Sequence, residues 1–209
     1  MQKFEEKKFT IPMLKGISAK NIEEHLKLYS GYVKFTNYIL DQITELSKDS
    51  AMPAVPAHAG QAGKWAYELG ELHRRFSFEY NGMRNHEIYF TSFENGPSML
   101  APGSPLMFAI EKEWGSFDVF LARIKAVAMT RGIGWAMLYW EKEAGCLLMQ
   151  WVDEQHLGHL NGLKPILALD MWEHSFVADY QPSGKKQYVE DYFSNLNWDF
   201  VENNFEALK

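Results

Sequence analysis

Residues 165–174 read PILALDMWEH, and the other predicted elements of this chain can be arranged around them. The first five residues form a short apolar run bounded by turn residues, which is typical of a buried strand. Asp170 follows the run directly, and a buried carboxylate is unfavourable unless another group balances its charge. His174 comes four residues later, so a turn of helix would return its imidazole to the carboxylate. Such a pair can share one metal ion, although on spacing alone an aspartate cap beside a core histidine is the more common arrangement.

The composition is that of a globular protein. The chain has 209 residues, enough for one or two domains, and its hydrophobic content of 46% argues against disorder. A net charge of −6 argues against nucleic acid or an anionic membrane as a partner. No apolar run approaches the roughly 20 residues of a membrane span, and the first residues contain no apolar signal region. Cys146 is the only cysteine, so no intrachain disulfide can form, and a cytoplasmic location is expected.

Two long helices are predicted in the first part of the chain. Apolar residues recur at helical spacing over residues 21–47, with Ser18 as the N-cap, and a second helical stretch covers residues 64–93. Residues 51–63 contain two prolines and two glycines and are expected to form the loop of a helical hairpin. Gly82 interrupts the second helix at a cost of about 1 kcal/mol relative to alanine. That cost indicates a structural reason, such as the close approach of another group.

The second part of the chain mixes helices and strands. Turn residues around positions 95–105 mark the expected boundary between an N-terminal hairpin domain, residues 1–96, and a C-terminal metal-binding domain, residues 97–209. Two apolar, aromatic runs joined by EKEAG predict a β-hairpin, and the run before Asp170 supplies a third strand. The predicted fold class is therefore α+β, a long helical hairpin followed by an α/β domain with a three-stranded antiparallel sheet. The shorter elements expected in this domain are helices at 106–114 and 117–131, strands at 135–140, 146–152 and 165–169, and short helices from 172 onward.

Several segments resemble the iron/manganese superoxide dismutase family. DMWEH (residues 170–174) after an apolar strand resembles the family's C-terminal signature, and NWDFV (197–201) resembles its Asn-Trp-(Asp/Glu) segment. GSF (115–117) and GIGWA (132–136) resemble two further family segments, and all of them occur in the family's order. The resemblance implies the fold derived above. It also implies a superoxide dismutase, which converts the small anion superoxide into dioxygen and hydrogen peroxide at a mononuclear Mn or Fe centre.

The resemblance implies three ligand histidines and one aspartate. NHEIYF (residues 85–90) resembles the family's Asn-His-x-x-Phe segment, which assigns His86. His25 lies early in the first helix and His86 late in the second, so an antiparallel hairpin brings them side by side. Asp170 and His174 would then close the site from the second domain. Three imidazoles and one carboxylate suit Mn or Fe better than a metal that prefers thiolates. For any one histidine a core or surface role is the simpler explanation, and only the four positions together favour a metal.

A further side chain in the family hydrogen-bonds the water on the metal and tunes its potential. Iron-type members usually carry a glutamine four residues before the second-helix ligand, whereas this chain has Gly82. A glycine there is typical of members that supply the residue from the second domain, and the matching region is residues 153–159. The region resembles members with histidine at this point, so His156 is the first expectation, Gln155 the second and His159 the third; an exposed polar loop is the alternative. The pattern favours manganese, with activity with both metals as an alternative.

The gateway to the site departs from the family pattern. The family has a tyrosine eight residues after the first ligand, whereas Tyr32 lies seven after His25. Seven residues are almost two α-helical turns, so we infer a one-residue deletion and expect Tyr32, or alternatively Tyr29, at the gateway. A second gateway tyrosine three residues past the last ligand is replaced by Val177. Glu173 is retained, and in the family it bonds the ligand histidine of the other subunit. The resemblance therefore implies a homodimer, with a tetramer as the alternative.

Superoxide would enter a locally positive funnel, for which Lys27, Lys34 and Lys185 are candidates. Two other functions remain open at this stage. One is another iron redox enzyme with histidine and carboxylate ligands, which needs open coordination positions and an organic pocket. A third histidine and many tryptophans would crowd such a pocket. The other is a non-catalytic structural member of the same fold, which should have lost ligands that this chain retains.

Overall fold

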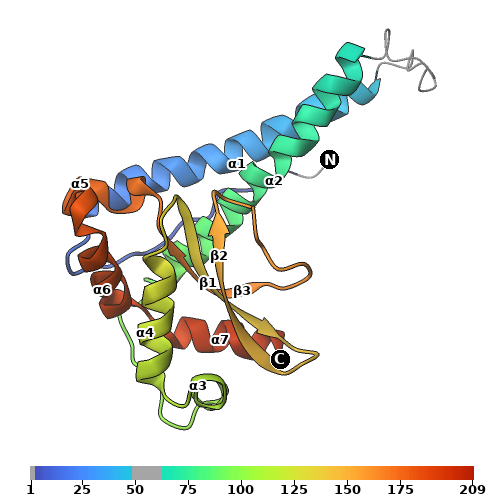
Figure 1. Cartoon of the computed structure of the whole chain (residues 1–209). Helices are drawn as coiled ribbons and strands as arrows, with labels where there is room; N and C mark the ends of the chain where they lie inside the picture. The colour runs from blue at the N-terminus through green and yellow to red at the C-terminus, as the bar shows by residue number, and fades with distance from the viewer. Residues whose placement is uncertain (1–2, 49–62) are drawn as a thin grey trace.

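The structure is a computed structural model, which describes residues 3–48 and 63–209, and it confirms the predicted α+β architecture. Helices α1 (Ala19–Lys48) and α2 (Gly63–Thr91) form the long arm that projects from the rest of the molecule in Figure 1. The predicted hairpin loop lies, apart from Gly63, outside the described residues. The elements that follow are α3 (Pro105–Trp114), α4 (Phe117–Ala128), β1 (Gly134–Glu141), β2 (Cys146–Asp153), β3 (Pro165–Asp170), the 3-10 turn η1 (Glu173–Ser175), α5 (Val177–Tyr180), the 3-10 turn η2 (Pro182–Gly184), α6 (Lys185–Asn195) and α7 (Trp198–Leu208).

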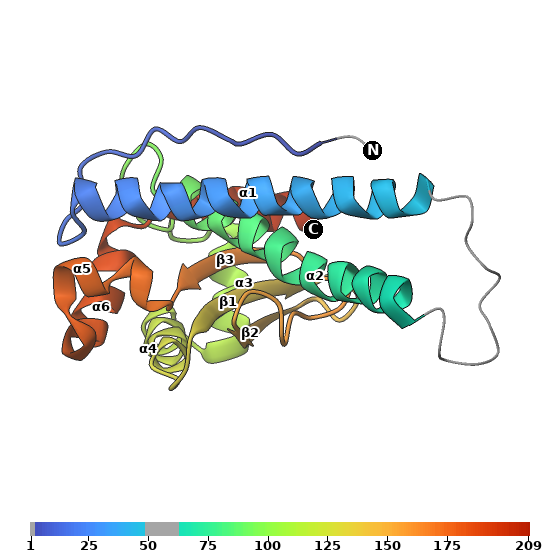
Figure 2. The ribbon, with the colours of Figure 1, turned by 90° about the horizontal axis from the view of Figure 1, so that it is seen from above.

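The first helix forms as its sequence predicts. Ser18 caps it, because its Oγ accepts a hydrogen bond from the main-chain N of Asn21 at 3.1 Å. Its buried face carries apolar residues at helical spacing, namely Ile22, Tyr29, Val33, Ile39 and Ile43. The extended N-terminal segment runs beside α1 (Figure 2), where the amide of Asn37 exchanges hydrogen bonds with the main chain of Phe4. These two hydrogen bonds attach the N-terminal segment to α1.

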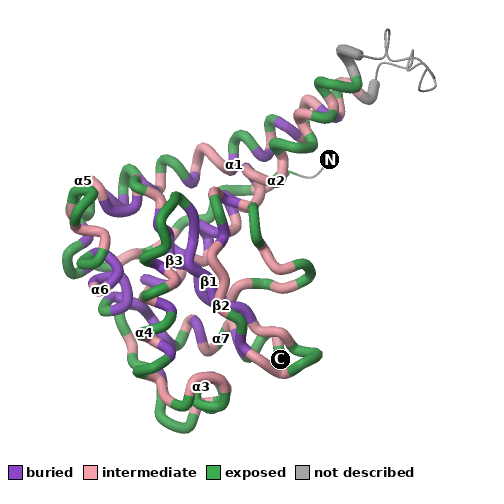
Figure 3. Tube along the Cα trace, viewed as in Figure 1, coloured by how far each residue is buried: buried purple, intermediate pink, exposed green. Residues whose placement is uncertain are grey.

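The sheet has the strand order β2-β1-β3, and both strand pairs are antiparallel. Strand β1 is therefore central, and its register places Trp135 opposite Asp170, the last residue of β3. Five consecutive residues of β3 are buried, which explains the near-continuous apolar run in the sequence. Figure 3 shows the buried segments concentrated in β1, β3 and the parts of the helices next to them.

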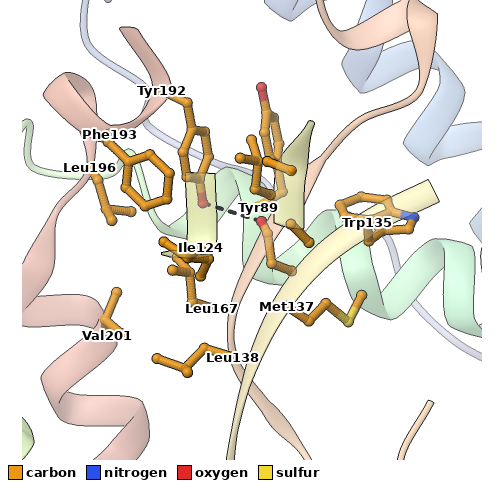
Figure 4. Close-up of a cluster of buried hydrophobic side chains, with 14 of the residues drawn as sticks. Tyr89, Ile124, Trp135, Met137, Leu138, Leu167, Tyr192, Phe193, Leu196 and Val201 are labelled. Carbon is orange, nitrogen blue, oxygen red and sulfur yellow. Dashed lines mark hydrogen bonds between the residues drawn. The ribbon is translucent and has the colours of Figure 1, made fainter. Parts of the chain in front are cut away.

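Packing between the sheet and the helices joins the two halves of the chain. Figure 4 shows side chains from both sides of this core, including Leu167 of β3, Ile124 of α4 and Tyr192 of α6. Tyr192 stacks on Tyr89 of α2, with ring centroids 5.7 Å apart. The Tyr192 hydroxyl also donates to the carbonyl O of Ala168 at 3.2 Å, so Tyr192 links α2 to β3. Over the described ranges, no helix is both long and apolar enough to cross a membrane.

Several ends of elements differ from the expected positions. Helix α4 ends at Ala128 and not near residue 131, because Thr130 donates to the carbonyl of Val127, three residues back, which forms a tight turn. The turn expected between Asp170 and His174 is the 3-10 turn η1 and not an α-helix. That tighter turn still returns the histidine to the aspartate, as the geometry below shows.

Candidate metal centre

Three histidine side chains lie around one carboxylate oxygen of Asp170, and the four residues come from four separate elements. The Nε2 atoms of His25 and His174 lie 3.1 and 3.2 Å from Oδ2 of Asp170, and Nε2 of His86 lies 3.5 Å from the same atom. One ligand atom from each of the four residues can be chosen so that all lie within 4.8 Å of one another. His25 comes from α1, His86 from α2, Asp170 from the end of β3 and His174 from η1.

These separations suit ligands of a single ion. With bonds of about 2.1 Å, two ligands at right angles are about 3.0 Å apart, and two ligands 120° apart are about 3.6 Å apart. The observed distances of 3.1, 3.2 and 3.5 Å fall in this interval. Three neutral imidazoles and one carboxylate form a donor set suited to Mn or Fe. The four predicted metal-binding residues are therefore brought together in the manner that a metal ion requires.

His86 presents a lone pair to the centre. Its Nδ1 lies 2.6 Å from the carbonyl O of Gly82, and a carbonyl can only accept, so Nδ1 carries the proton. Its Nε2 is then deprotonated, and it is buried without a hydrogen bond to any described residue. A buried nitrogen in this state needs a partner, and a metal ion would provide one.

Burial and electrostatics favour the protonation states that metal binding requires at His86 and Asp170. Burial lowers the pKa of His86 to about 3, and repulsion from His25 contributes to this shift. Burial works to raise the pKa of Asp170, but attraction and hydrogen bonds from His174 and His25 outweigh it and hold that pKa well below its usual value. The main-chain N of Trp172 donates to Oδ1 of Asp170 at 2.8 Å, which leaves Oδ2 facing the histidines. Neutral imidazole and ionised carboxylate are the forms that bind metals.

Aromatic side chains enclose the cluster. Phe90 and Tyr89 lie 4.9 and 5.0 Å from the His25 ring, measured between centroids, and Trp135 lies 5.1 Å from the His86 ring. Trp172 stacks on His174 with ring centroids 5.7 Å apart. Three of the four ligand residues are buried, and the side chain of His174 remains 22% exposed. Of the four ligand residues, His174 is the most exposed.

Gln155 is the polar residue of the 153–159 segment that reaches the site. It is buried, its Oε1 accepts from Nε1 of Trp135 at 2.9 Å, and its Nε2 donates to the hydroxyl of Tyr32 at 2.9 Å. Gln155, the second expectation, is thus the residue of the three whose side chain contacts both Trp135 and Tyr32. The physical reason is a tight turn in which Glu154 adopts a φ of 51° and the main chains of Asp153 and Leu157 pair. This turn directs Gln155 inward.

The two histidines of the same segment occupy different places. His156 is half-buried, with its ring centroid 5.7 Å from that of Phe78, and its Nδ1 is buried without a hydrogen-bond partner among the described residues. His159 lies on the far side of Gln155, where its Nε2 is 3.2 Å from the carbonyl O of that residue. The sequence could not distinguish the three positions, because they lie within five residues of one turn whose conformation it does not specify.

Tyr32 lies beside the centre. Its ring centroid lies 5.0 Å from that of His86, whereas the alternative, Tyr29, directs its hydroxyl toward the main-chain N of Lys7 at 2.9 Å. A Cβ built on Gly82 would lie 2.5 Å from the Tyr32 ring, so the glycine is needed for this approach. Burial raises the pKa of Tyr32, and the nearby charges of Asp170 and Glu79 raise it further.

The charged residues expected near the site lie elsewhere or are already paired. Lys27 forms ion pairs with Glu23 and Glu24 at 2.9 and 2.8 Å, and Lys185 donates to the carbonyl O of Thr130. Lys34 is exposed on α1. Glu173 is exposed beside His174.

Arg75 provides a cation close to Tyr32 that was not predicted from the sequence. The guanidinium of Arg75 lies 3.8 Å from the centroid of the Phe78 ring, which itself lies 6.0 Å from the Tyr32 ring. Its charge works to lower the pKa of Tyr32, and its Nη2 pairs with Glu79 at 2.8 Å. Arg75 precedes Gly82 by seven residues, which is two turns of α2. That spacing was the signal that could have identified it.

The fold and the site together define a class of protein, one in which a helical hairpin and an antiparallel sheet build a buried three-histidine, one-carboxylate centre. A sequence model of the family described as "Iron/manganese superoxide dismutases, C-terminal domain" matches residues 102–204. The superoxide dismutase [Fe] of Aquifex pyrophilus is 32% identical over 94% of this chain and 88% of that protein. The superoxide dismutase [Mn] of Mycolicibacterium smegmatis is 32% identical over 88% of this chain and 81% of its own length. The superoxide dismutase [Mn/Fe] of Aeropyrum pernix is 30% identical over 87% of this chain and 79% of its own. This chain belongs to the iron/manganese superoxide dismutase family.

Proposed function

We propose that this chain is a superoxide dismutase that uses one Mn or Fe ion per subunit, held by His25, His86, Asp170 and His174. The observation that carries the proposal is the convergence of three imidazole Nε2 atoms on Oδ2 of Asp170, with Nε2 of His86 buried and otherwise unpartnered among the described residues. Family membership supplies the reaction class. The aromatic enclosure supports it, since the substrate of such a site must be small.

The bound ion would supply one-electron chemistry in both directions, oxidising one superoxide to dioxygen and reducing a second to hydrogen peroxide. The chain's own residues hold and orient the reactants and manage the protons. Tyr32 keeps its phenolic proton at neutral pH because its pKa is raised by burial and by the charge of Asp170. Its hydroxyl accepts from Nε2 of Gln155, so the Tyr32 proton is free to point toward the site. We assign Tyr32 and Gln155 to proton delivery.

We propose manganese as the metal that gives the higher activity, with some activity with iron. A hydrogen-bond donor close to the ion would stabilise the more negatively charged surroundings of the oxidised state and so lower the potential, and Mn(III) needs more lowering than Fe(III). Gln155 comes from the second domain and donates to the hydroxyl of Tyr32, whose ring fills the space beside Gly82, and this arrangement supports the preference. In this proposal Gln155 tunes the potential of the metal, a role first expected for His156.

We further propose a homodimer in the cytoplasm, with a tetramer as the alternative assembly. Glu173 is exposed next to His174, the most exposed of the four ligand residues, so a partner subunit could reach both. The single cysteine, Cys146, is in keeping with a reducing compartment. Residues 1–96 and 97–209 would act as two domains with the metal between them, since each supplies two ligands.

The decisive experiment is metal analysis of the purified protein, followed by removal of the metal and reconstitution with Mn or Fe in separate samples. We expect close to one ion per chain and superoxide disproportionation in both samples, with the Mn form the more active. His86→Ala should lose metal and activity, whereas His73→Ala should retain both, because His73 is an exposed histidine on the same helix. A fully metallated protein without dismutase activity would overturn the proposal.

A further inference from the structure

His159 contacts the site only through the main chain of Gln155. It lies in the loop between β2 and β3, half-buried, with its Nε2 3.2 Å from the carbonyl O of Gln155 and its Nδ1 2.7 Å from the hydroxyl of Tyr139. Its hydrogen bonds and ring contacts within the described residues are to Gln155 and Tyr139, and none is to a ligand residue. Its position is therefore one step removed from the residues that face the substrate.

The partners of His159 determine where its protons lie. A carbonyl oxygen only accepts, so Nε2 carries a hydrogen and donates it to Gln155. In the neutral ring Nδ1 is then an acceptor, and the Tyr139 hydroxyl can donate to it. Burial lowers the pKa of His159, as does the neighbouring His156, which favours this neutral ring, although the hydrogen bond to Gln155 works in the opposite direction. Tyr139 is buried on the central strand β1, so it gives the imidazole a fixed support.

The carbonyl that His159 contacts also links the turn to the metal-binding helix. It accepts a second hydrogen bond, at 3.0 Å, from Nδ2 of Asn85, the residue before His86 on α2. Two donors occupy the two lone pairs of this oxygen. The preceding residue, Glu154, holds a left-handed conformation with a φ of 51°, which is unfavourable for a residue with a side chain. The turn therefore depends on contacts from other elements to keep its shape.

The side chain of Gln155 requires this fixed shape. Its amide must reach Trp135 and Tyr32 simultaneously, and both distances are 2.9 Å. A rotation of the peptide that carries the carbonyl would move the amide away from one or both partners. We propose that His159, supported by Tyr139, is a positioning residue that holds the main-chain carbonyl of Gln155 and so keeps its side-chain amide between Trp135 and Tyr32. The effect on catalysis rests on the function proposed above, whereas the positioning does not.

Two substitutions of His159 separate this role from simple packing. His159→Leu fills similar space but removes both hydrogen bonds, whereas His159→Gln can place an amide N–H where Nε2 lies and an oxygen toward Tyr139. His73→Leu, at an exposed histidine of α2, is the matched control. All three proteins are prepared with the full chain, metal-loaded and metal-free.

The first measurement is hydrogen exchange of the amides of residues 153–157, which reports on the turn itself. These amides are hydrogen-bonded in the turn, for example Asp153 N to Leu157 O at 2.8 Å and Leu157 N to Asp153 O at 3.1 Å. We expect exchange about tenfold faster in His159→Leu, the equivalent of one lost hydrogen bond, and within about twofold of the parent in His159→Gln. Unchanged exchange in His159→Leu would overturn the proposal. So would faster exchange that spreads equally through β1 and β3, or that His159→Gln fails to restore, since either would indicate packing alone.

The second measurement is the reduction potential of the metal-loaded protein, together with turnover. We expect the potential to shift and turnover to fall about three- to tenfold in His159→Leu, with both restored in His159→Gln. A potential that is the same in His159→Leu as in the parent would overturn the link between His159 and the metal. If the parent protein binds metal but shows no dismutase activity, the proposed function fails, while hydrogen exchange still tests the positioning.

Discussion

The ligand cluster and the turn beside it are built from different kinds of backbone. His25 and His86 belong to helices of 30 and 29 residues, and Asp170 ends a buried strand, so regular hydrogen bonding fixes their positions. Gln155 belongs to a turn that contains a left-handed residue and is held by hydrogen bonds from α2, β1 and its own loop. The difference indicates that the ligand cluster should be disrupted mainly by substitution of its own side chains. The turn should also be disrupted by substitution of residues in other elements that hydrogen-bond to it.

The largest expected effect is on the cluster. Asp170→Ala removes the only negative charge among the four groups and the shared neighbour of three imidazoles. We expect metal affinity to fall by more than about 100-fold, since loss of an outer partner of a ligand alone costs 10- to 100-fold. The measurement is metal content after dialysis against a chelator. Asp191→Ala, at another buried aspartate, should retain its metal even if it loses stability, and retention of metal by Asp170→Ala would contradict the ligand assignment.

A second effect concerns the stability of the metal-free protein as a function of pH. The pKa of His86 in the folded protein is about 3, below the ordinary value of 6.5. Between these two pH values His86 is protonated in the unfolded protein but neutral in the folded one. Stability is therefore fully present above about pH 6.5 and falls by about 1.4 kcal/mol per pH unit as the pH decreases toward 3. Burial also lowers the pKa of His25, which steepens the loss. Urea unfolding of metal-free protein at several pH values provides the measurement, and stability that is constant or rises on acidification would show that these imidazoles are not buried in neutral form.

Within the turn, substitutions of the neighbouring residues Gln155 and His156 should have different effects on turnover. Gln155→Leu removes the partners of Tyr32 and of the buried Nε1 of Trp135, so turnover should fall about 10- to 100-fold, with about 1–3 kcal/mol of lost stability. His156→Leu should change turnover less than about threefold, because that ring packs on Phe78 and its buried Nδ1 has no hydrogen-bond partner among the described residues. Steady-state kinetics of the two metal-loaded variants decide between them. A larger fall in turnover for His156→Leu than for Gln155→Leu would indicate that His156 is the residue that tunes the metal.

The smallest expected effect compares two glycines of α2. Gly82→Ala places a Cβ 2.5 Å from the Tyr32 ring, which should cost about 1–3 kcal/mol, partly offset by about 1 kcal/mol of better helix propensity. Gly70→Ala has no atom within 4 Å of its added Cβ and should stabilise the protein by up to about 1 kcal/mol. Urea unfolding of both variants measures the difference. Equal effects at the two positions would mean that Tyr32 does not need the space above Gly82.

The regular parts of this molecule could be predicted because each depends on local patterns. Apolar residues at helical spacing identified α1, and the aromatic runs around EKEAG identified the β-hairpin, which the structure confirms. The ends of elements were less accurate, as at α4, because a single hydrogen bond three residues back decides where a helix stops. The antiparallel hairpin also placed His25 and His86 side by side, and their ring centroids lie 4.9 Å apart.

The sequence by itself determined the fold class, the family and the identity of four residues able to bind one ion. It did so because helix periodicity, strand burial and a fixed order of motifs are properties of short segments. Only the tertiary structure decided that Gln155 points inward and His156 does not, that Arg75 lies near Tyr32, and that His159 supports the turn. Those arrangements depend on a φ of 51° at Glu154 and on contacts between residues up to 123 positions apart, such as Gln155 and Tyr32. Contacts of that range are set by how the sheet and hairpin pack together, which no local pattern encodes.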